Sequence, residues 1–573
     1  MRVATPFERN SGNQARPRRR GAVWAVALAL AVIAATALAS GCAGAQDGAQ
    51  GSAASTASAA GAETGATTTE AGAGTAAEAE AAPAGQEGGQ PAAEKVFRMS
   101  RSWEDAASWD PAALSGNDTI ALLPQIFETL LHLDIDGGSS PMLAESWEAA
   151  DDGLSYTFHL RKGVQFHKGY GEMTSEDVKF SFERHRDPDV ASIHVETLNL
   201  ANIAAIETPD PLTAVFRLSN PDVDFITRVS MSEATIVSKA AFDAMGLDGF
   251  ASEPIGTGPF QYDGGVIGGR TEAVKFPEFW GGEPKIDRVV NTVITDTNTN
   301  YAAFENGELD MIYVYYMDKV NEYAEKGYQD FYLPTNQLLY IGVNVQIEPW
   351  NNAGAREALF KAIDPQYYID QIFYGNETYP GGVIPPKCKY ALKDYLKADY
   401  DPEGAKRLLA EAGFSSGVKT TLWTVNDDIS PPPALIAQQQ LLAAGIDVEL
   451  QMVDFGVFID RVRAGTADMW LLYNSTPPIA DDTIVRYTSA KYPGSNWSGI
   501  MDAGYDELVE KGLAAKSEAE KTKYFEDAQK VLMDLNAIYP VTTYGYDSVV
   551  SPNVTGIELW GDNCLRLRNA DMQ

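Results

Sequence analysis

The stretch over residues 109–185 constrains the fold of this chain more than any other, because it carries an ordered series of local structural signals. Its apolar residues over 120–131 have a spacing that predicts a helix. Every second residue over 155–160 is apolar, which predicts a half-buried strand. Gly163 ends this alternation and residues 164–166 resume it, which predicts a β-hairpin.

A helix start follows in the same stretch. Thr174 and Asp177 have the spacing of a capping box, with aspartate in place of the usual glutamate. Val178 and Phe182 then lie four residues apart, on one face of the expected helix. These signals describe a scaffold, because none of them requires a nucleophile, a metal ligand or a tuned acid.

Two segments of this stretch carry a family resemblance. Residues 143–169 and 175–184 closely resemble the signature region of the family 5 extracellular solute-binding proteins. The resemblance covers nearly the whole chain after about Val96, and its further segments follow in family order: 254–260, 279–284, 306–310 and 355–364.

The resemblance implies both a function and a fold. Members of the family are lipid-tethered or periplasmic receptors that feed dipeptides, oligopeptides, nickel chelates, some oligosaccharides and other solutes to ABC importers. The implied fold class is α/β, namely the two-lobe periplasmic-binding-protein fold of type II with an extra inserted domain, mixed sheets and an interlobe cleft with a hinge. The implied limits are 96–128, 237–337 and 540–573 for lobe I, 129–236 for the inserted domain, and 338–539 for lobe II.

The size and composition of the chain independently limit the number of domains and the kinds of partner that it can bind. A chain of 573 residues and 61.9 kDa is too long for one core, so two or three domains are expected. Its net charge of -35 argues against nucleic-acid binding, because no basic stripe is available for phosphates. Solubility outside the cell is the simplest reason for such a charge.

The N-terminal residues predict a signal peptide followed by a tether. Residues 1–41 combine arginines with an apolar run and small residues before Cys42, which predicts a lipoprotein signal peptide and lipid attachment at Cys42. A membrane-spanning anchor is the alternative. Residues 42–95 are rich in alanine, glycine and glutamate, which predicts a disordered tether, with an acidic interaction tail as the alternative.

The two remaining cysteines, Cys388 and Cys564, could form a disulfide in an extracellular protein. The resemblance places them in different lobes, where a bridge would hinder closure. Two unlinked cysteines are therefore favoured, although the sequence does not decide whether they are joined.

The later part of the chain alternates helices and strands. Helices are expected after Asp401, before Gly445, over 458–462 and after Ser517, and strands over 446–450 and 469–472. Such alternation predicts a sheet with helices on its faces.

Catalytic signals are absent from the sequence. The chain has only five histidines, and it contains no HExxH or CxxC pattern. His159 and His167 could meet at a metal, but solvated or core histidines are the favoured interpretation. The glycines of 256–259 predict a tight turn. The sequence therefore predicts no enzyme, no cofactor and no metal site.

A binding protein instead needs aromatic faces and a few polar anchors. Matching to peptide-binding members of the family implies a loop and an aromatic pair in lobe I, and aromatic and polar residues in lobe II; for each aromatic residue, core packing is the alternative. The implied ligand-binding residues are Ser115, Gly116, Asn117, Tyr313, Tyr315, Trp423, Phe455, Tyr473, Asn474 and Trp497.

The most informative difference from peptide binders concerns the anchor for a peptide's amino terminus. Those members carry Gly-Trp-x-x-Asp, whose aspartate pairs with the α-ammonium group, whereas residues 473–477 here end in Pro477. A buried ammonium without a counter-charge would be costly. We therefore expect a sugar, an aromatic or apolar metabolite, or a capped peptide, unless Asp481 or Asp482 replaces the missing anchor.

These observations predict an extracytoplasmic, monomeric lipoprotein that captures a small solute and delivers it to the permease of an ABC importer. It would contact the membrane through Cys42 and bind no nucleic acid. A sensor that presents its ligand to a membrane receptor is the first alternative, and a surface hydrolase is the second. The sequence names neither the solute nor the permease.

Overall fold

The computed structural model describes residues 93–101, 108–113, 122–266, 269–314, 316–427, 429–562 and 564–573. All of them belong to the compact unit Gln90–Gln573. The expected signal peptide, Cys42 and most of the expected tether lie outside the described residues, as do Ser115, Gly116, Asn117 and Tyr315.

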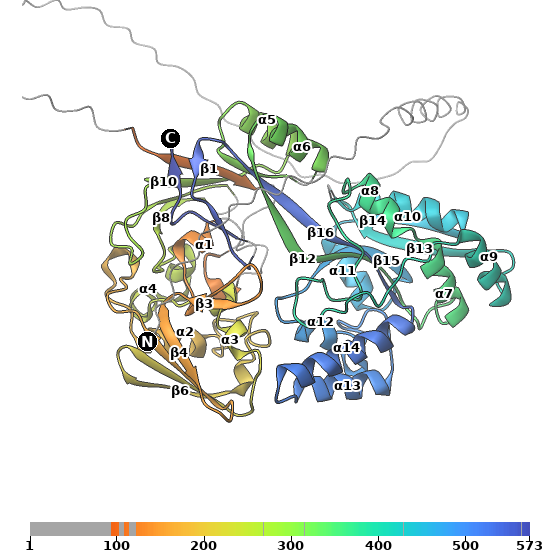
Figure 1. The fold of residues 1–573 in the computed structure, drawn as a ribbon, viewed down its shortest axis with the longest axis horizontal. Coiled ribbons are helices and arrows are strands. Elements are labelled where there is room, and N and C mark those ends of the chain that lie inside the picture. The colour runs from red at the N-terminus through yellow and green to blue at the C-terminus, as the bar shows by residue number, and fades with distance from the viewer. Residues whose placement is uncertain are drawn as a thin grey trace, which may run out of the picture. The chain divides into compact units, whose positions relative to one another are not determined.

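A ten-stranded mixed sheet is the largest element of the fold (Figure 1). Its two long central strands, β12 (Gln329–Val343) and β16 (Ile538–Val550), are antiparallel neighbours. The other strands, in spatial order around this pair, are β14 (Ile446–Val453), β13 (Val418–Val425) and β15 (Met469–Ser475) on the β12 side, and β11 (Met311–Val314), β1 (Val96–Arg101), β10 (Arg288–Val293), β9 (Arg270–Lys275) and β8 (Phe260–Gly265) on the β16 side.

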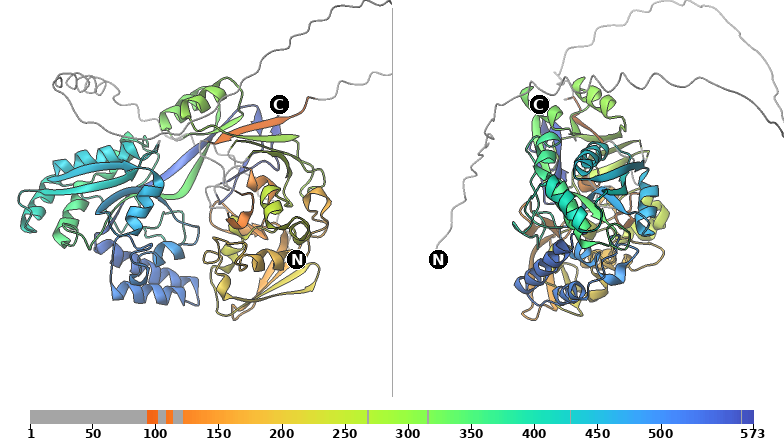
Figure 2. Two further views of the ribbon diagram at one scale, coloured as in Figure 1. Left: turned by 180° about the vertical axis from the view of Figure 1, so that it is seen from behind. Right: turned by 90° about the vertical axis from the view of Figure 1, so that its right-hand side faces the viewer.

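The long strands join two groups of elements. We call the elements from β1 to α6 together with residues 551–573 the first lobe, and residues 344–537 the second lobe. Figure 2 shows the green β12 and the blue β16 running from one lobe to the other. Their register shifts between Leu333 and Gln337, where Pro334 supplies no backbone N–H to the ladder. The domain limits expected from the resemblance stay predictions.

A second, four-stranded sheet lies in the first lobe, in the order β4 (Ala144–Ala149), β5 (Ser155–Leu160), β7 (Thr213–Leu218) and β6 (Ile203–Asp210). The strand expected over 155–160 is confirmed as β5, but the expected hairpin is wrong. β5 pairs with β4 and β7, whereas residues 164–166 contribute only a bridge between Gln165 and Glu172. Val164 and Phe166 are apolar because they are buried in the core.

The helix after Thr174 is confirmed as α2 (Ser175–Arg184), and the Asp177 carboxylate accepts a hydrogen bond from the Thr174 N–H at 2.9 Å. The helix expected over 120–131 is much shorter, because α1 spans only Leu123–Ile126. Phe127 has extended backbone angles, and Leu131–Leu133 form β2, which pairs with β3 (Ser139–Pro141). The other helices of the first lobe are α3 (Phe225–Arg228), α4 (Lys239–Ser252), α5 (Thr297–Glu305) and α6 (Met317–Glu325).

The alternation of helices and strands expected in the later part of the chain is confirmed. The Asp401 carboxylate accepts from the Gly404 N–H at 2.8 Å and caps α9, and Ser517 caps α14. Among the described residues, no helix has the length and apolar character needed to cross a bilayer. The helices of the second lobe are α7 (Ala353–Ala362), α8 (Pro365–Gln371), α9 (Pro402–Glu411), α10 (Pro431–Ala443), α11 (Phe455–Arg463), α12 (Asp481–Val485), α13 (Ala503–Leu513) and α14 (Glu518–Asp534).

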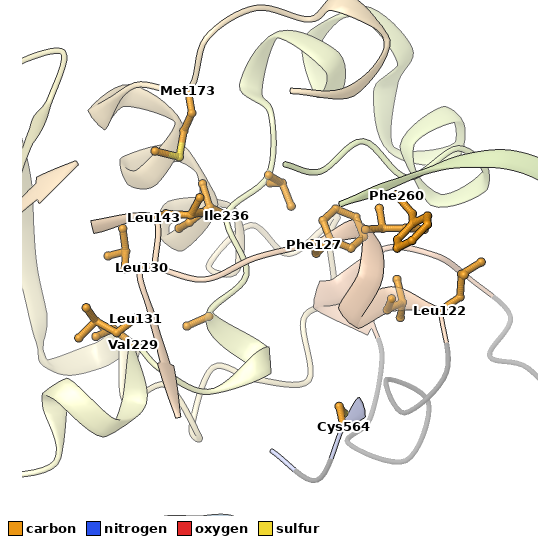
Figure 3. Close-up of a cluster of buried hydrophobic side chains, with 14 of the residues drawn as sticks. Leu122, Phe127, Leu130, Leu131, Leu143, Met173, Val229, Ile236, Phe260 and Cys564 are labelled. Atoms are coloured by element: carbon orange, nitrogen blue, oxygen red, sulfur yellow. The ribbon is translucent and has the colours of Figure 1, made fainter. Parts of the chain in front are cut away.

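Each lobe has its own hydrophobic core. Figure 3 shows part of the first core, in which Phe127 and Phe260 lie beside α1. Cys564 belongs to the first core and Cys388 to the second. Both are buried and are not joined to each other by a disulfide, as expected. Tyr473 packs against both cores, so it marks the place where the lobes join.

Candidate functional site

The first junction between the lobes lies where β12 and β16 pass from one lobe to the other. The ring of Tyr473, near the end of β15, lies 4.5 Å from that of Tyr544 on β16. Glu377 is buried beside them and accepts hydrogen bonds from the Tyr332 hydroxyl at 2.8 Å and the Gly545 N–H at 2.8 Å. A side chain at Gly545 would meet the Tyr332 ring at 2.6 Å, so this contact requires glycine. Sequence reasoning missed Glu377 and Tyr544, which carry no pattern of their own.

Three other predicted binding residues of the second lobe have different surroundings. The Asn474 side-chain oxygen accepts a hydrogen bond from Arg486 at 2.7 Å. The ring of Trp423 lies 4.3 Å from the guanidinium carbon of Arg461, within the same lobe. Phe455 is 59% exposed at the start of α11. The roles of these side chains toward a solute stay predictions.

Two further predicted aromatic residues are engaged in packing. Trp497 lies 6.2 Å from Trp470 and 6.3 Å from Phe458, both buried in the second core. Tyr313 is 2% exposed in the first core, on β11. Their roles toward a solute stay predictions.

Residues 473–477, which stand where peptide binders carry the anchor for the amino terminus, lie next to the strands that join the lobes. The N–H of Thr476 donates to the carbonyl of Asn336 at 2.7 Å, and its side chain is buried against Thr483, 3.2 Å away. A small cavity of about 30 Å³ lies beside Pro478, with residues of both lobes on its walls. The described residues that line it are Leu133, Asp134, Gly137, Thr227 and Gly561 of the first lobe, and Asn336, Lys387, Lys389 and Pro478. Among them the second lobe contributes two lysines and no carboxylate.

The second junction is a set of buried charges that we call the charged cluster: Asp222, Asp224 and Arg228 of the first lobe, and Lys389, Asp481 and Lys521 of the second. Its centre is Asp224, whose side chain is fully buried. Asp224 accepts from Lys521 at 2.8 Å and from Lys389 at 3.1 Å. The Tyr390 hydroxyl lies 2.7 Å from Oδ1 and 2.8 Å from Oδ2 of Asp224 and donates to this carboxylate.

Arg228 forms the other half of the charged cluster. Its Nε lies 2.9 Å from Asp222 in its own lobe, and its Nη2 lies 2.6 Å from Asp481 in the second lobe. Asp481 also pairs with Lys521 at 2.7 Å. The Asp482 carboxylate accepts from the Thr197 hydroxyl at 3.3 Å, again across the lobes.

The cluster favours its charged forms. Burial alone would raise the pKa of Asp224, but the charges of Lys521 and Lys389 outweigh it and hold that pKa below its usual range. Burial alone would likewise lower the pKa of Lys521, but Asp481 and Asp224 raise it. Both partners of the central pair therefore remain ionised at neutral pH.

The two aspartates that could replace the missing anchor are thus already bonded to protein side chains. Asp481 holds one cation of each lobe, and Asp482 bonds to Thr197. Burial, with the neighbouring charge of Asp481, raises the pKa of Asp482. Neither carboxylate is left to pair with a ligand's ammonium group in this closed arrangement.

The predicted metal alternative receives no support from geometry. His167 is buried and hydrogen-bonded to the carbonyl of Gly258 at 2.9 Å, whereas His159 is partly exposed on β5. Within the part of the chain that the structure describes, no group of three His, Cys, Asp or Glu side chains is arranged to hold a metal ion.

Comparison with known proteins gives this geometry a context. Residues 139–496 match the family described as bacterial extracellular solute-binding proteins, family 5 Middle. The glutathione-binding protein GsiB of Escherichia coli O1:K1 / APEC is 30% identical over 476 residues, which cover 80% of this chain and 91% of that protein.

Two similar solved structures were determined with ligands. The periplasmic binding protein DppA from Helicobacter pylori, in complex with the peptide STSA, has a TM-score of 0.70 and 26% identity, covering 83% of this chain and 98% of that chain. The PBP AgaA from A.tumefacien R10, in complex with agropinic acid, has a TM-score of 0.68 and 26% identity, covering 83% and 99%. These likenesses confirm the expected fold class, the two-lobe periplasmic-binding fold of type II.

Proposed function

Because this chain belongs to the family 5 extracellular solute-binding proteins, which are extracytoplasmic, serve ABC importers and are not enzymes, we propose that it captures a small solute that needs no free α-ammonium group. The solute lies between the two lobes and reaches the permease with the closed protein. Tyr473 and Asn474, at the crossing strands, contribute to its binding surface, together with the other residues expected from the resemblance.

The observation that carries this proposal is the engagement of Asp481 and Asp482. Pro477 stands where peptide binders have the anchoring aspartate, and the two aspartates expected as its substitutes bond to Arg228, Lys521 and Thr197. A buried ammonium group that finds no carboxylate is strongly disfavoured.

Overall similarity does not choose between solutes. The H. pylori and A.tumefacien proteins are equally identical to this chain, yet one was solved with a peptide and the other with agropinic acid. The choice therefore depends on individual residues at the anchor, and these favour a non-peptide or capped solute.

Membrane attachment is the second part of the proposal. Lipidation of Cys42 and a tether over 42–95 would hold the receptor near its permease while leaving the lobes free to close. The monomeric state is part of the same proposal.

Native mass spectrometry of the full-length protein purified from its own host tests the nature of the solute. The proposal predicts one or a few discrete masses that do not form a peptide series. A ladder of masses separated by residue increments, with free amino termini, would contradict it.

A further inference from the structure

We propose that the charged cluster is a latch that closes the two lobes without help from a solute, so that the solute-free protein populates the closed form at low ionic strength. The proposal concerns the solute-free protein, so it holds whichever solute is captured. It rests on which partners each charge has in its own lobe and which it has across the interface.

Asp224 has no structural reason to be buried other than closure. All three groups that bond to its side chain, those of Lys389, Tyr390 and Lys521, lie in the second lobe. A fully buried carboxylate is tolerated only when such partners are present. In an open form the Asp224 side chain would return to water, and among the described residues it would lose no side-chain hydrogen bond within the first lobe.

The arrangement of the remaining charges leaves each of them with an oppositely charged partner when the lobes separate. When the lobes separate, Arg228 keeps Asp222 at 2.9 Å in the first lobe, and Lys521 keeps Asp481 at 2.7 Å in the second. Removing one partner from a buried pair is costly because it leaves an uncompensated charge. Here each lobe retains one complete pair, so the latch can open and close reversibly.

The closed arrangement is electrically balanced. Three carboxylates meet three cations, and the side chains of Asp222, Asp224, Arg228 and Lys521 are each at most 6% exposed. Asp481 is 13% exposed and Lys389 is 25% exposed, and Lys389 also lies 3.7 Å from the exposed Glu518. Balance of this kind offsets the cost of removing the charges from water.

Tyr390 is held ready to receive Asp224. Its backbone φ of 69° is unusual for a residue with a side chain. Contacts within the second lobe maintain this conformation, because Gln529 donates to the Tyr390 carbonyl at 2.7 Å and the ring of Phe525 packs edge-on at 5.3 Å. The hydroxyl is therefore positioned before the lobes meet.

Dissolved ions can reach one side of the latch. An open cavity of about 710 Å³ has Asp222, Arg228, Asp481 and Lys521 on its walls. Salt stabilises separated charges relative to paired ones when the pair is accessible to solvent. The closed form should therefore lose population as the salt concentration rises.

The test is a distance measurement between nitroxide labels on the two lobes of the solute-free, full-length protein. Labels at Ala205→Cys on β6 and Ala519→Cys on α14 occupy exposed positions, in a Cys42→Ser background whose other two cysteines are buried. Solute is removed by unfolding, dialysis and refolding. We expect a short distance to dominate at 50 mM salt and a longer one to grow at 1 M.

Asp224→Asn keeps the size of the side chain and removes its charge. We expect it to lower the ratio of short to long distances about tenfold at 50 mM salt and to weaken the salt response. Asp243→Asn is the matched control, because Asp243 is an exposed aspartate of the same lobe that pairs with Lys239. It should leave the ratio unchanged.

An equal ratio in the parent protein and in Asp224→Asn at both salt concentrations would overturn the proposal, as would a parent protein that is fully open at 50 mM salt. If Asp224→Asn does not refold, Lys389→Gln takes its place, since Lys389 is partly exposed and lies in a loop. It should lower the ratio about twofold, and no change in that variant would overturn the proposal.

Discussion

Two buried carboxylates in this protein, Glu128 and Asp224, have opposite electrostatic environments. They are 2% and 0% exposed, respectively. Burial raises the pKa of Glu128 to about 7, although Trp280 and the charge of Arg568 oppose the shift. The pKa of Asp224 instead lies below its usual range, because lysines outweigh its burial.

The difference follows from where the partners lie. Glu128 accepts from the indole N–H of Trp280 at 2.7 Å and the hydroxyl of Thr257 at 2.9 Å, both neutral groups of its own lobe. Among the described residues, all the groups that donate hydrogen bonds to the Asp224 side chain belong to the other lobe. A carboxylate that can be neutralised serves as a permanent part of one core, whereas one that requires cations from across an interface serves a contact that forms and breaks.

The largest effect is expected for Glu128→Gln. The folded pKa of Glu128 exceeds its ordinary value of 4.5, so its contribution to stability is fully present below pH 4.5 and is lost as the pH rises through 7. Between pH 4 and pH 8 the parent protein should therefore lose about 3 kcal/mol relative to the variant.

Thermal or denaturant unfolding of both proteins across this pH range measures the difference. Glu145→Gln serves as the control, because Glu145 is an exposed acid of β4 in the same lobe. A constant difference between Glu128→Gln and the parent at all pH values would show that folding does not raise the pKa of Glu128, and would remove the contrast with Asp224.

A smaller pair of effects distinguishes the two lysines that hold Asp224. Lys521 is 4% exposed and pairs with two carboxylates of the cluster, whereas Lys389 is 25% exposed. We expect Lys521→Gln to lower the closed-to-open ratio by about tenfold and Lys389→Gln by about twofold. The same nitroxide distances measure both. Equal effects would mean that burial does not set the strength of these contacts.

Much of the fold was predictable from local signals. Thr174, Asp401 and Ser517 each predicted a helix start that the structure contains, because capping depends only on neighbouring residues. The hairpin expected after Gly163 was wrong because alternation reveals burial but not the partner strand.

The site was less predictable for the same reason. Asp224 and Lys521 are separated by 297 positions in the chain, and no short pattern connects them. Asp481 was singled out as a potential replacement anchor, but only the structure pairs it with Arg228 and Lys521. The domain limits and the individual binding residues stay predictions.

The central claim is that the acidic residues near the missing anchor close the lobes and do not bind the solute's amino group. Titration calorimetry with glutathione and with N-acetylglutathione tests it most directly, since the similar GsiB proteins are named for glutathione. We expect no preference for the free amino group, whether both compounds bind or neither does. Binding of glutathione at least tenfold tighter than its acetylated form would contradict it.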